Sequence, residues 1–165
     1  MSKPRDATLL YLFKRENGVV TQICLAMKKR GLGAGKWNGA GGKVEAGESI
    51  EEAAIRETSE EIGVTPRNIL KVAELTFQFP HKPSYDQTVH VYVAESWDGN
   101  LLESEEMAPS WFATGEIPWN DCWPSDEFWM PRVLQGEFVT ATFHFSEDEK
   151  ILYKMITARV APTAQ

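Results

Sequence analysis

Cysteine is scarce in this sequence. Cys24 and Cys122 are the only two among 165 residues, and they form neither a metal-ligand spacing nor a disulfide framework. We expect both to be free, mostly buried thiols, as is usual in a reducing compartment. The cytoplasm is therefore the predicted location.

Long hydrophobic runs and targeting signals are also missing. No stretch approaches the ~18 consecutive apolar residues that span a bilayer. Residues 1–15 lack the basic segment, apolar run and small-residue cleavage site of a secretory signal. We accordingly expect no membrane partner.

The sequence also lacks an excess of basic residues. Lys and Arg number 17 against 24 Asp and Glu, so the formal net charge is −7. A net-acidic chain binds nucleic acid poorly without specificity, and we expect no nucleic-acid partner. A phosphorylated ligand would instead require a local site, with a metal ion.

The composition that is present, 42% hydrophobic and 25% charged, is typical of a globular protein. At roughly 150 residues per domain, the length predicts one domain over 1–165. No internal repeat or long linker divides it. Residues 161–165 are expected to form a frayed tail.

Alternation of apolar and turn-forming segments predicts several strands and two helices. The expected strands are 8–13, 19–27, 70–79, 88–95, 138–145 and 151–160, and the expected helices are 49–62 and 126–135. Glu16-Asn17-Gly18 is a hairpin turn signal. After Asn100 the pattern is irregular, and Pro131 must lie near the first turn of the second helix or kink it. These elements predict an α/β (α+β) domain with helices packed outside a mixed sheet.

Residues 31–43 contain six glycines in thirteen positions. This is too many for a helix or a regular strand, so we predict a loop with unusual backbone angles. Such loops are often only turns, but beside an acidic helix the backbone of Gly39–Gly42 can approach a ligand closely.

The first helix has well-defined ends. Ser49 is a good N-cap, Glu52 completes a capping box, and Gly63 suits the left-handed position after the last turn. At about 100° per residue, Glu57 and Glu61 share the inward side with the apolar residues, and Glu60 borders it.

Two interpretations of these acids compete. A charge run is usually a solvated face. However, like charges four residues apart repel, and a buried carboxylate is costly unless it is paired or coordinates a metal. With only Arg56 nearby, we favour a site for a hard divalent cation, Mg²⁺ or Mn²⁺.

A set of spaced residues around this helix resembles the signature of a known family, the Nudix box of MutT-like nucleotide pyrophosphohydrolases. The matching residues are Gly42, Glu48, Arg56-Glu57, Glu60-Glu61 and Gly63-Val64. One departure is Thr58, where the family usually has a bulky aliphatic residue, and we interpret that position as packing.

The resemblance extends over most of the chain, toward the animal oxidised-purine nucleoside triphosphatases of this family. It is carried by Met27–Gly31, Gly33–Gly35, Trp37–Gly39, Gly41–Val44, Glu103-Ser104, Glu106-Met107, Trp111-Phe112 and Trp123-Pro124. The resemblance implies the Nudix fold, an α/β/α sandwich around a mixed β-sheet. It also implies magnesium-dependent cleavage between the α- and β-phosphates of a nucleoside triphosphate.

The same resemblance implies roles at the charged positions. Glu57, Glu60 and Glu61 would hold Mg²⁺ and orient or deprotonate the attacking water, together with the Gly41 carbonyl and Glu106. Arg56 would pair with Glu48 or a box carboxylate, and its alternative is a weak surface pair with Glu60. Lys28, Lys43 and the backbone at Gly42 are candidate contacts to the substrate.

Base recognition is implied for a second group of residues. By alignment it comprises Thr8, Asn38, Ala40, Trp123, Pro124, Ser125 and Asp126. Asn38 offers a donor and an acceptor, Asp126 can accept or, if burial retains its proton, donate, and Trp123 offers a stacking face. The relatives have a second aspartate where this chain has Ser125, and a phenylalanine where it has Ala40. Trp111, Trp119 and Trp129 are interpreted as core.

The predicted function is hydrolysis of oxidised or modified purine nucleoside triphosphates such as 8-oxo-dGTP, which cleans the nucleotide pool. Two alternatives remain open. One is a broader nucleoside triphosphate pyrophosphohydrolase that includes alkylated purines, and the other is a catalytically silent nucleotide sensor. The intact set of three glutamates argues against silence. We expect a monomer, because the sequence shows no free apolar seam.

Overall fold

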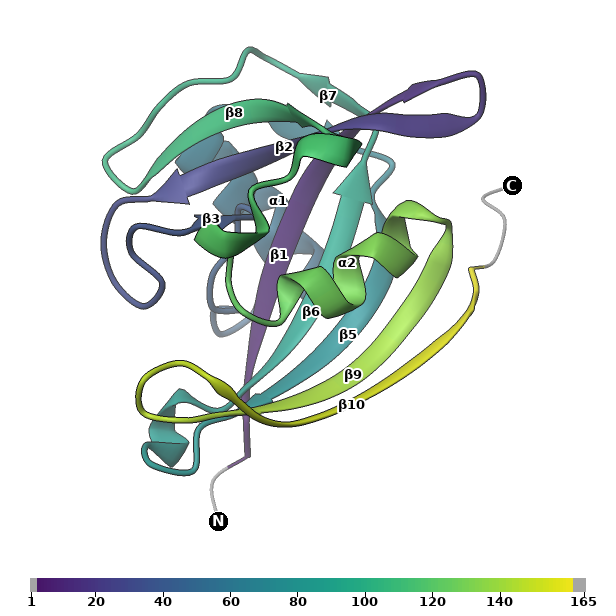
Figure 1. Ribbon diagram of the computed structural model, residues 1–165. Helices are drawn as coiled ribbons and strands as arrows, with labels where there is room; N and C mark the ends of the chain where they lie inside the picture. Colours follow the sequence, from purple (N-terminus) through teal and green to yellow (C-terminus); the bar gives the residue numbers. More distant parts are fainter. Residues whose placement is uncertain (1–2, 162–165) are drawn as a thin grey trace.

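A computed structural model describes residues 3–161 (Figure 1). The strands are β1 (Arg5–Glu16), β2 (Val19–Lys28), β3 (Trp37–Asn38), β4 (Thr65–Arg67), β5 (Leu70–Gln78), β6 (Gln87–Ala94), β7 (Ser96–Asp98), β8 (Met107–Ala113), β9 (Glu137–Phe145) and β10 (Ile151–Val160). The α-helices are α1 (Ile50–Ile62) and α2 (Asp126–Leu134), and short 3₁₀ turns lie at Pro83–Tyr85, Thr114–Glu116 and Trp119–Asp121.

One large mixed sheet organises the chain. Its strand order is β10-β9-β5-β6-β1-β2-β3, with β8 paired to β2, and β4 and β7 form a separate pair. β1 is parallel to β6 and β5 is parallel to β9, whereas the other neighbours are antiparallel. The N-terminal strand β1 therefore lies in the interior of the sheet, whereas the C-terminal strand β10 lies at its edge.

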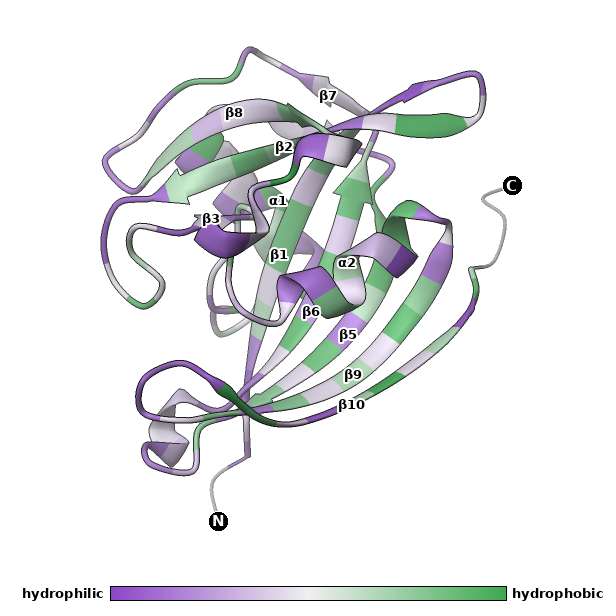
Figure 2. Ribbon diagram, in the orientation of Figure 1, coloured by the Kyte–Doolittle hydropathy of each residue, from purple (hydrophilic) through white to green (hydrophobic). Residues whose placement is uncertain are grey.

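The two faces of the sheet carry separate cores, because successive side chains of a strand point to opposite faces. On one face Trp129, Met130 and Val133 of α2 pack with the strands. On the other face Ala54 and Ile62 of α1 do so. α2 lies in front of the sheet and α1 behind it (Figure 1), and Figure 2 shows alternating apolar and polar bands along the strands. The predicted α/β/α layering is confirmed.

The local signals predicted the ends of several elements. Asn17 and Gly18 both have positive φ, 50° and 78°, in the turn between β1 and β2. Ser49 and Glu52 form both hydrogen bonds of the capping box, and Gly63 is left-handed with φ 78°. The two cysteines are free and buried, as expected.

The prediction of irregular structure after Asn100 is wrong for β8. This strand runs along β2 from Lys28 to Gln22, and the sequence hides it because Pro109 interrupts the pattern. Proline cannot donate to a ladder and is tolerated on an edge strand. The short strands β3, β4 and β7 were also not predicted, and Pro131 lies inside α2, beyond its first turn.

The predicted frayed tail begins at Ala161, which is the last described residue. Ala161 N–H donates to the Gly136 carbonyl oxygen at 3.1 Å. The rest of the predicted tail, residues 162–165, lies outside the described residues. Neither α-helix within residues 3–161 has the length and apolar character needed to cross a bilayer.

A divergence of β1 and β2 creates the space for a site. The strands pair only near the hairpin, up to Phe13 and Ile23. Farther along, β2 pairs with β3, where Ala26 faces Asn38. The chain then crosses to β1, where Ala40 pairs with Leu10. Residues 38–44 thus lie in the opening between the two strands.

Candidate active site

The glycine-rich segment 40–44 pairs with β1 like an additional antiparallel strand. Ala40 exchanges backbone hydrogen bonds with Leu10 (2.7 and 3.1 Å), and Thr8 N–H donates to the Gly42 carbonyl (2.9 Å). Alternate residues of such a strand point their backbone groups to the opposite side. Gly41 therefore turns its N–H and carbonyl away from β1, and its N–H donates to Glu61 Oε2 at 3.3 Å.

Two positions in this segment have no room for a side chain. A Cβ at residue 41 would lie 1.7 Å from the Thr8 carbonyl oxygen, and a Cβ at residue 42 would lie 2.7 Å from Glu57 Oε1. Neither glycine has positive φ. Close approach to the Thr8 backbone and to the Glu57 carboxylate, rather than an unusual backbone angle, requires glycine at these two positions.

The three glutamates of α1 differ in their environment. Glu61 is buried at 5% exposure, the Glu57 side chain is 15% exposed and that of Glu60 is 60% exposed. Thr58 is fully buried and its hydroxyl donates to the Ala54 carbonyl at 2.7 Å. Thr58 is therefore a packing residue. The helix points Glu57 and Glu61 toward the glycine segment and leaves Glu60 at the rim.

Burial dominates the electrostatics of Glu61. Its removal from water, followed by the adjacent Glu57, raises the pKa of Glu61 to about 9, and the charge of Glu106 acts in the same direction. The Gly41 N–H opposes this only in part. A buried carboxylate beside two other acids is the environment in which a bound cation is most favourable.

Arg56 connects the helix to the segment that follows the glycines. Its Nε and Nη2 donate to both carboxylate oxygens of Glu48 at 3.0 and 2.8 Å, and its Nη1 contacts Glu57 at 2.9 Å and Glu60 at 3.3 Å. Nη2 also donates to the Lys43 carbonyl at 3.3 Å. The guanidinium lowers the pKa of Glu48 to about 2. Arg56 thus makes both the predicted pair with Glu48 and the alternative pair with Glu60.

Glu106 reaches the site from the loop before β8. Arg30 Nη2 donates to Glu106 Oε1 at 3.0 Å, and the Ser104 hydroxyl accepts from the Glu106 N–H at 3.2 Å. Lys29 binds the same loop through Glu103 and the Ser104 carbonyl, at 2.7 Å each. Sequence reasoning did not single out Arg30 for this contact, because 75 residues of intervening chain conceal the pairing.

The donor set around this acidic cavity fits a hard divalent cation. A space of about 780 Å³ is bordered by Gly41, Glu57, Glu60, Glu61 and Glu106. Carboxylate and backbone carbonyl oxygens are the ligands that such cations take, and the buried, negatively surrounded Glu61 supplies the electrostatic reason to bind one. Within residues 3–161 no three acidic, His or Cys side chains yet converge as ligands, and Arg56 and Arg30 contact three of the carboxylates instead.

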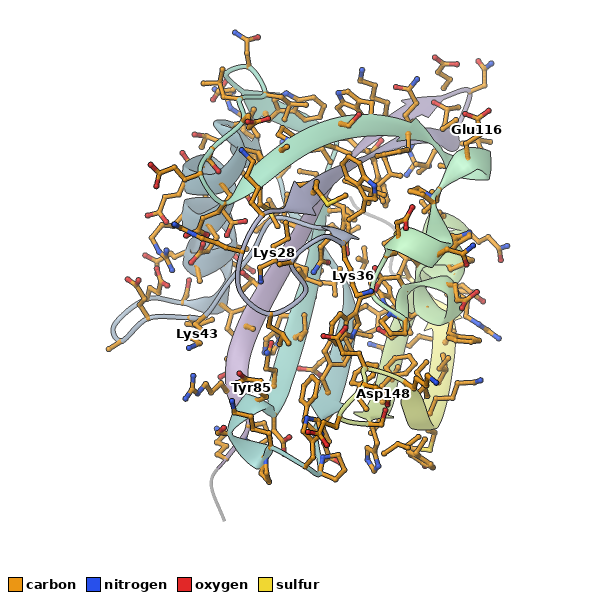
Figure 3. The ribbon with its side chains drawn as sticks, turned by 60° about the vertical axis from the view of Figure 1, so that its left-hand side comes forward. Lys28, Lys36, Lys43, Tyr85, Glu116 and Asp148 are labelled. Carbon is orange, nitrogen blue, oxygen red and sulfur yellow. The ribbon has the colours of Figure 1, made fainter. Side chains whose placement is uncertain are left out.

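A second cavity of about 380 Å³, the base cavity, adjoins the acidic one. Leu9, Phe77, Phe79, Val89 and Trp123 are among its apolar lining, and Thr8, Asn38 and Asp126 are among its polar lining. Lys28, Gly41, Gly42, Lys43 and Met107 border both cavities. Lys28, Lys43 and Tyr85 lie near β1 (Figure 3). One ligand can therefore extend from one cavity into the other.

Two polar side chains in the base cavity are held from behind. Tyr11 Oη donates to Asn38 Oδ1 at 3.2 Å, and Trp129 Nε1 donates to Asp126 Oδ1 at 3.3 Å. Burial raises the pKa of Asp126 to about 7, although the Trp129 hydrogen bond opposes the shift. Trp129, interpreted as core, is buried at 0% exposure and also contacts a residue of the site.

Not every residue implied for base recognition borders the cavity. Ala40 is 2% exposed and packs in the core beneath α1, and Pro124 and Ser125 are not among the lining residues. The Ser125 hydroxyl, the Thr8 hydroxyl and Trp123 Nε1 are buried with no hydrogen-bond partner among the described residues. Sequence reasoning did not identify Tyr11 as a residue of the site. Residues 7, 9 and 11 of β1 point to the same face of the sheet, and Ala7 and Leu9 border the cavity.

Comparison with known proteins agrees with this geometry. The model of the NUDIX domain family matches residues 3–133. This chain belongs to the NUDIX domain family. The Nudix chain is 41% identical over 152 residues to the mouse (Mus musculus) "Oxidized purine nucleoside triphosphate hydrolase", covering 92% of this chain and 94% of the mouse protein. It is also 41% identical over 131 residues to the zebrafish (Danio rerio) protein of the same name, covering 79% and 83%.

Solved Nudix structures show the same fold. The crystal structure of a MutT protein from Bacillus halodurans superposes with a TM-score of 0.79 at 26% identity, covering 92% of this chain and 97% of that chain. Nudix hydrolases generally use a divalent metal ion. The acidic cavity on α1 is therefore the expected place for such an ion in this Nudix chain.

Proposed function

We propose that this protein hydrolyses oxidised purine nucleoside triphosphates, such as 8-oxo-dGTP, to the monophosphate and pyrophosphate in a Mg²⁺-dependent reaction. The observation that carries the proposal is the continuity of the two cavities across Lys28, Gly41, Gly42 and Lys43. A triphosphate with its cation fits the acidic side, and a purine fits the apolar side. The names of the mouse and zebrafish relatives support the same substrate class.

The acidic cavity supplies the groups for phosphoryl transfer. Glu57, Glu60, Glu61, Glu106 and the Gly41 carbonyl would hold the cation, which when bound neutralises the polyphosphate and lowers the pKa of a bound water. Glu61 is the buried member of this set and is our candidate for orienting the water or removing its proton. Lys28 and Lys43 supply positive charge where the two cavities meet.

Arg56 acts on this chemistry indirectly. Its five N–H donors are distributed over Glu48, Glu57, Glu60 and the Lys43 carbonyl. These contacts tie α1 to the segment that carries Gly41 and Gly42. Arg56 is therefore proposed as a positioning residue, and its planar fork cannot be replaced by the single ammonium of lysine.

The base cavity accounts for purine selection. Phe79 and Trp123 belong to its apolar lining, and Asn38 and Asp126 belong to its polar lining. A pocket with few polar groups in an apolar lining fixes the orientation of a ligand through those groups. The remaining implied contact is Thr8, whose buried hydroxyl has no hydrogen-bond partner among residues 3–161.

We further propose a cytoplasmic monomer without nucleic-acid or membrane partners. The free, buried cysteines and the net charge of −7 support this part of the proposal. Sedimentation at micromolar concentration tests it, and a concentration-dependent increase in mass would contradict it.

A coupled assay tests the proposed reaction. Phosphate release from 8-oxo-dGTP in Mg²⁺ is measured with and without inorganic pyrophosphatase, and the monophosphate is quantified by chromatography in Mg²⁺ and in EDTA without the coupling enzyme, which itself needs Mg²⁺. We expect phosphate only with pyrophosphatase and monophosphate only with Mg²⁺. Phosphate without pyrophosphatase would show cleavage at another bond, and nucleotide binding without turnover would identify a sensor.

A further inference from the structure

Two buried aromatic residues lie behind the base cavity, and neither has a role in the proposed reaction. Tyr11 of β1 is 1% exposed and Trp129 of α2 is fully buried. Their ring centroids are 6.1 Å apart at an interplanar angle of 58°. Each ring carries one polar atom, and each polar atom donates a hydrogen bond to a side chain of the cavity.

Tyr11 determines how the Asn38 amide is oriented. The Tyr11 hydroxyl donates to Asn38 Oδ1 at 3.2 Å, and the Gly39 N–H donates to the same oxygen at 2.9 Å. A carbonyl oxygen has two lone pairs, so both acceptor positions are occupied. The amide NH₂ makes no hydrogen bond within residues 3–161, and Asn38 borders the cavity. Asn38 therefore offers a ligand only donors.

The position of Tyr11 is itself fixed. A Cβ at residue 39 would lie 2.9 Å from Tyr11 Cζ, so the ring occupies the space that only glycine leaves open. Burial, together with the charge of Asp126, raises the pKa of the Tyr11 phenol. The hydroxyl consequently stays protonated and remains a donor to Asn38.

We infer that Tyr11 is a positioning residue that sets the hydrogen-bond polarity of the base cavity, so that the cavity favours a purine presenting a carbonyl oxygen rather than an amino group to Asn38. This inference rests on the proposed function for the identity of the ligand. An asparagine amide exchanges its donor and acceptor ends by a 180° rotation. Loss of the Tyr11 hydroxyl removes one of the two restraints against that rotation.

Binding of two product nucleotides tests the inference without requiring turnover. Calorimetry gives Kd for 8-oxo-dGMP and 8-oxo-dAMP, which carry an oxo and an amino group, respectively, at C6. The guanine also has an N1 proton and a 2-amino group, so the readout is the change in preference between wild type and variant. We expect wild type to prefer 8-oxo-dGMP and Tyr11→Phe to reduce that preference about fivefold, the effect of one neutral hydrogen bond. The matched control is Tyr92→Phe, a buried tyrosine on the opposite face of the sheet, which should leave the preference unchanged.

A preference unchanged within twofold in Tyr11→Phe, or an equal loss in Tyr92→Phe, would overturn the inference. Asn38→Asp provides a second variant, because it replaces the donors by acceptors and should reverse the preference toward 8-oxo-dAMP. Unaltered preference in that variant would also overturn it.

Kinetics separate this inference from the proposed function. With 8-oxo-dGTP, Tyr11→Phe should raise KM and leave kcat within twofold, since Tyr11 does not touch the acidic cavity. If wild type fails to hydrolyse either triphosphate, the proposed function is wrong, and the two Kd values still decide the role of Tyr11.

Discussion

At the scale of single residues, the buried carboxylates of Glu61 and Asp126 both have raised pKa values, but for different reasons. Glu61 is surrounded by other acids, Glu57 and Glu106, in addition to being buried. Asp126 is raised by burial alone and retains a hydrogen bond from Trp129. A bound cation would stabilise the Glu61 carboxylate, whereas protonation stabilises Asp126. Stability measurements should therefore distinguish the two residues.

Asp126 makes the protein less stable as pH rises toward neutrality. Its pKa is about 7 in the folded chain against 3.8 for an ordinary aspartate, so unfolding releases a proton between these values and the contribution is lost as pH rises through 7. From pH 5 to 7.5, wild type should lose about 2–3 kcal/mol more unfolding free energy than Asp126→Asn. Urea titrations measure this, with the exposed Asp121→Asn as control. Parallel pH profiles for wild type and Asp126→Asn would contradict the assignment.

Glu61→Gln should lower turnover and raise the stability of the metal-free protein. Turnover should fall at least ~100-fold, as expected for loss of a general base. In EDTA at pH 8 the Tm of the variant should be roughly 2–8 °C higher, about 1–2 kcal/mol, because Glu61 with its raised pKa must take up a proton on folding and glutamine need not. Mg²⁺ should raise the Tm of wild type but not of the variant. The exposed Glu116→Gln is the control, and near-normal turnover of Glu61→Gln would remove Glu61 from the chemistry.

At the scale of elements, segment 40–44 connects β1 to α1 and so positions the groups of the acidic cavity. Its pairing with β1 fixes where Gly41 and Gly42 meet α1, and Arg56 fixes the other end through the Lys43 carbonyl. The capping box and Gly63 set the register of α1 against this segment. The catalytic geometry thus depends on two backbone elements meeting, with very little space between them.

Adjacent glycine substitutions should have different consequences. A Cβ at residue 41 meets backbone oxygen, so Gly41→Ala should displace the segment from β1 and cost more than about 2 kcal/mol. A Cβ at residue 42 meets the flexible end of Glu57, so Gly42→Ala should fold and lose turnover. Chemical denaturation and kcat measure the two effects. Gly115→Ala, whose Cβ would have no atom of residues 3–161 within 4 Å, should change neither. Identical behaviour of Gly41→Ala and Gly115→Ala would refute the account.

At the scale of the whole molecule, sequence reasoning succeeded where the information is local. The hairpin turn, both ends of α1 and the strand β10 follow from capping, turn chemistry and periodicity. The inward side of α1 followed from helical geometry. The family, and with it the layered fold, followed from the spacing of the box residues.

The sequence could not show what the topology brings together. The ion pair between Arg30 and Glu106 and the hydrogen bond between Tyr11 and Asn38 join segments that only the sheet makes adjacent. β8 was missed because its proline is tolerated only at an edge, and the edge is a property of the assembled sheet. Ala40 was implied as a cavity residue, but the alternation along segment 40–44 points it into the core.

The continuity of the two cavities is tested most directly by comparing kcat/KM for 8-oxo-dGTP and dGTP in Mg²⁺, with chromatography of the products. The account predicts at least ~10-fold higher kcat/KM for 8-oxo-dGTP, about 1.4 kcal/mol of discrimination by the base cavity, with monophosphate and pyrophosphate as the only products. Equal kcat/KM values for the two nucleotides, or release of a single phosphate, would contradict it.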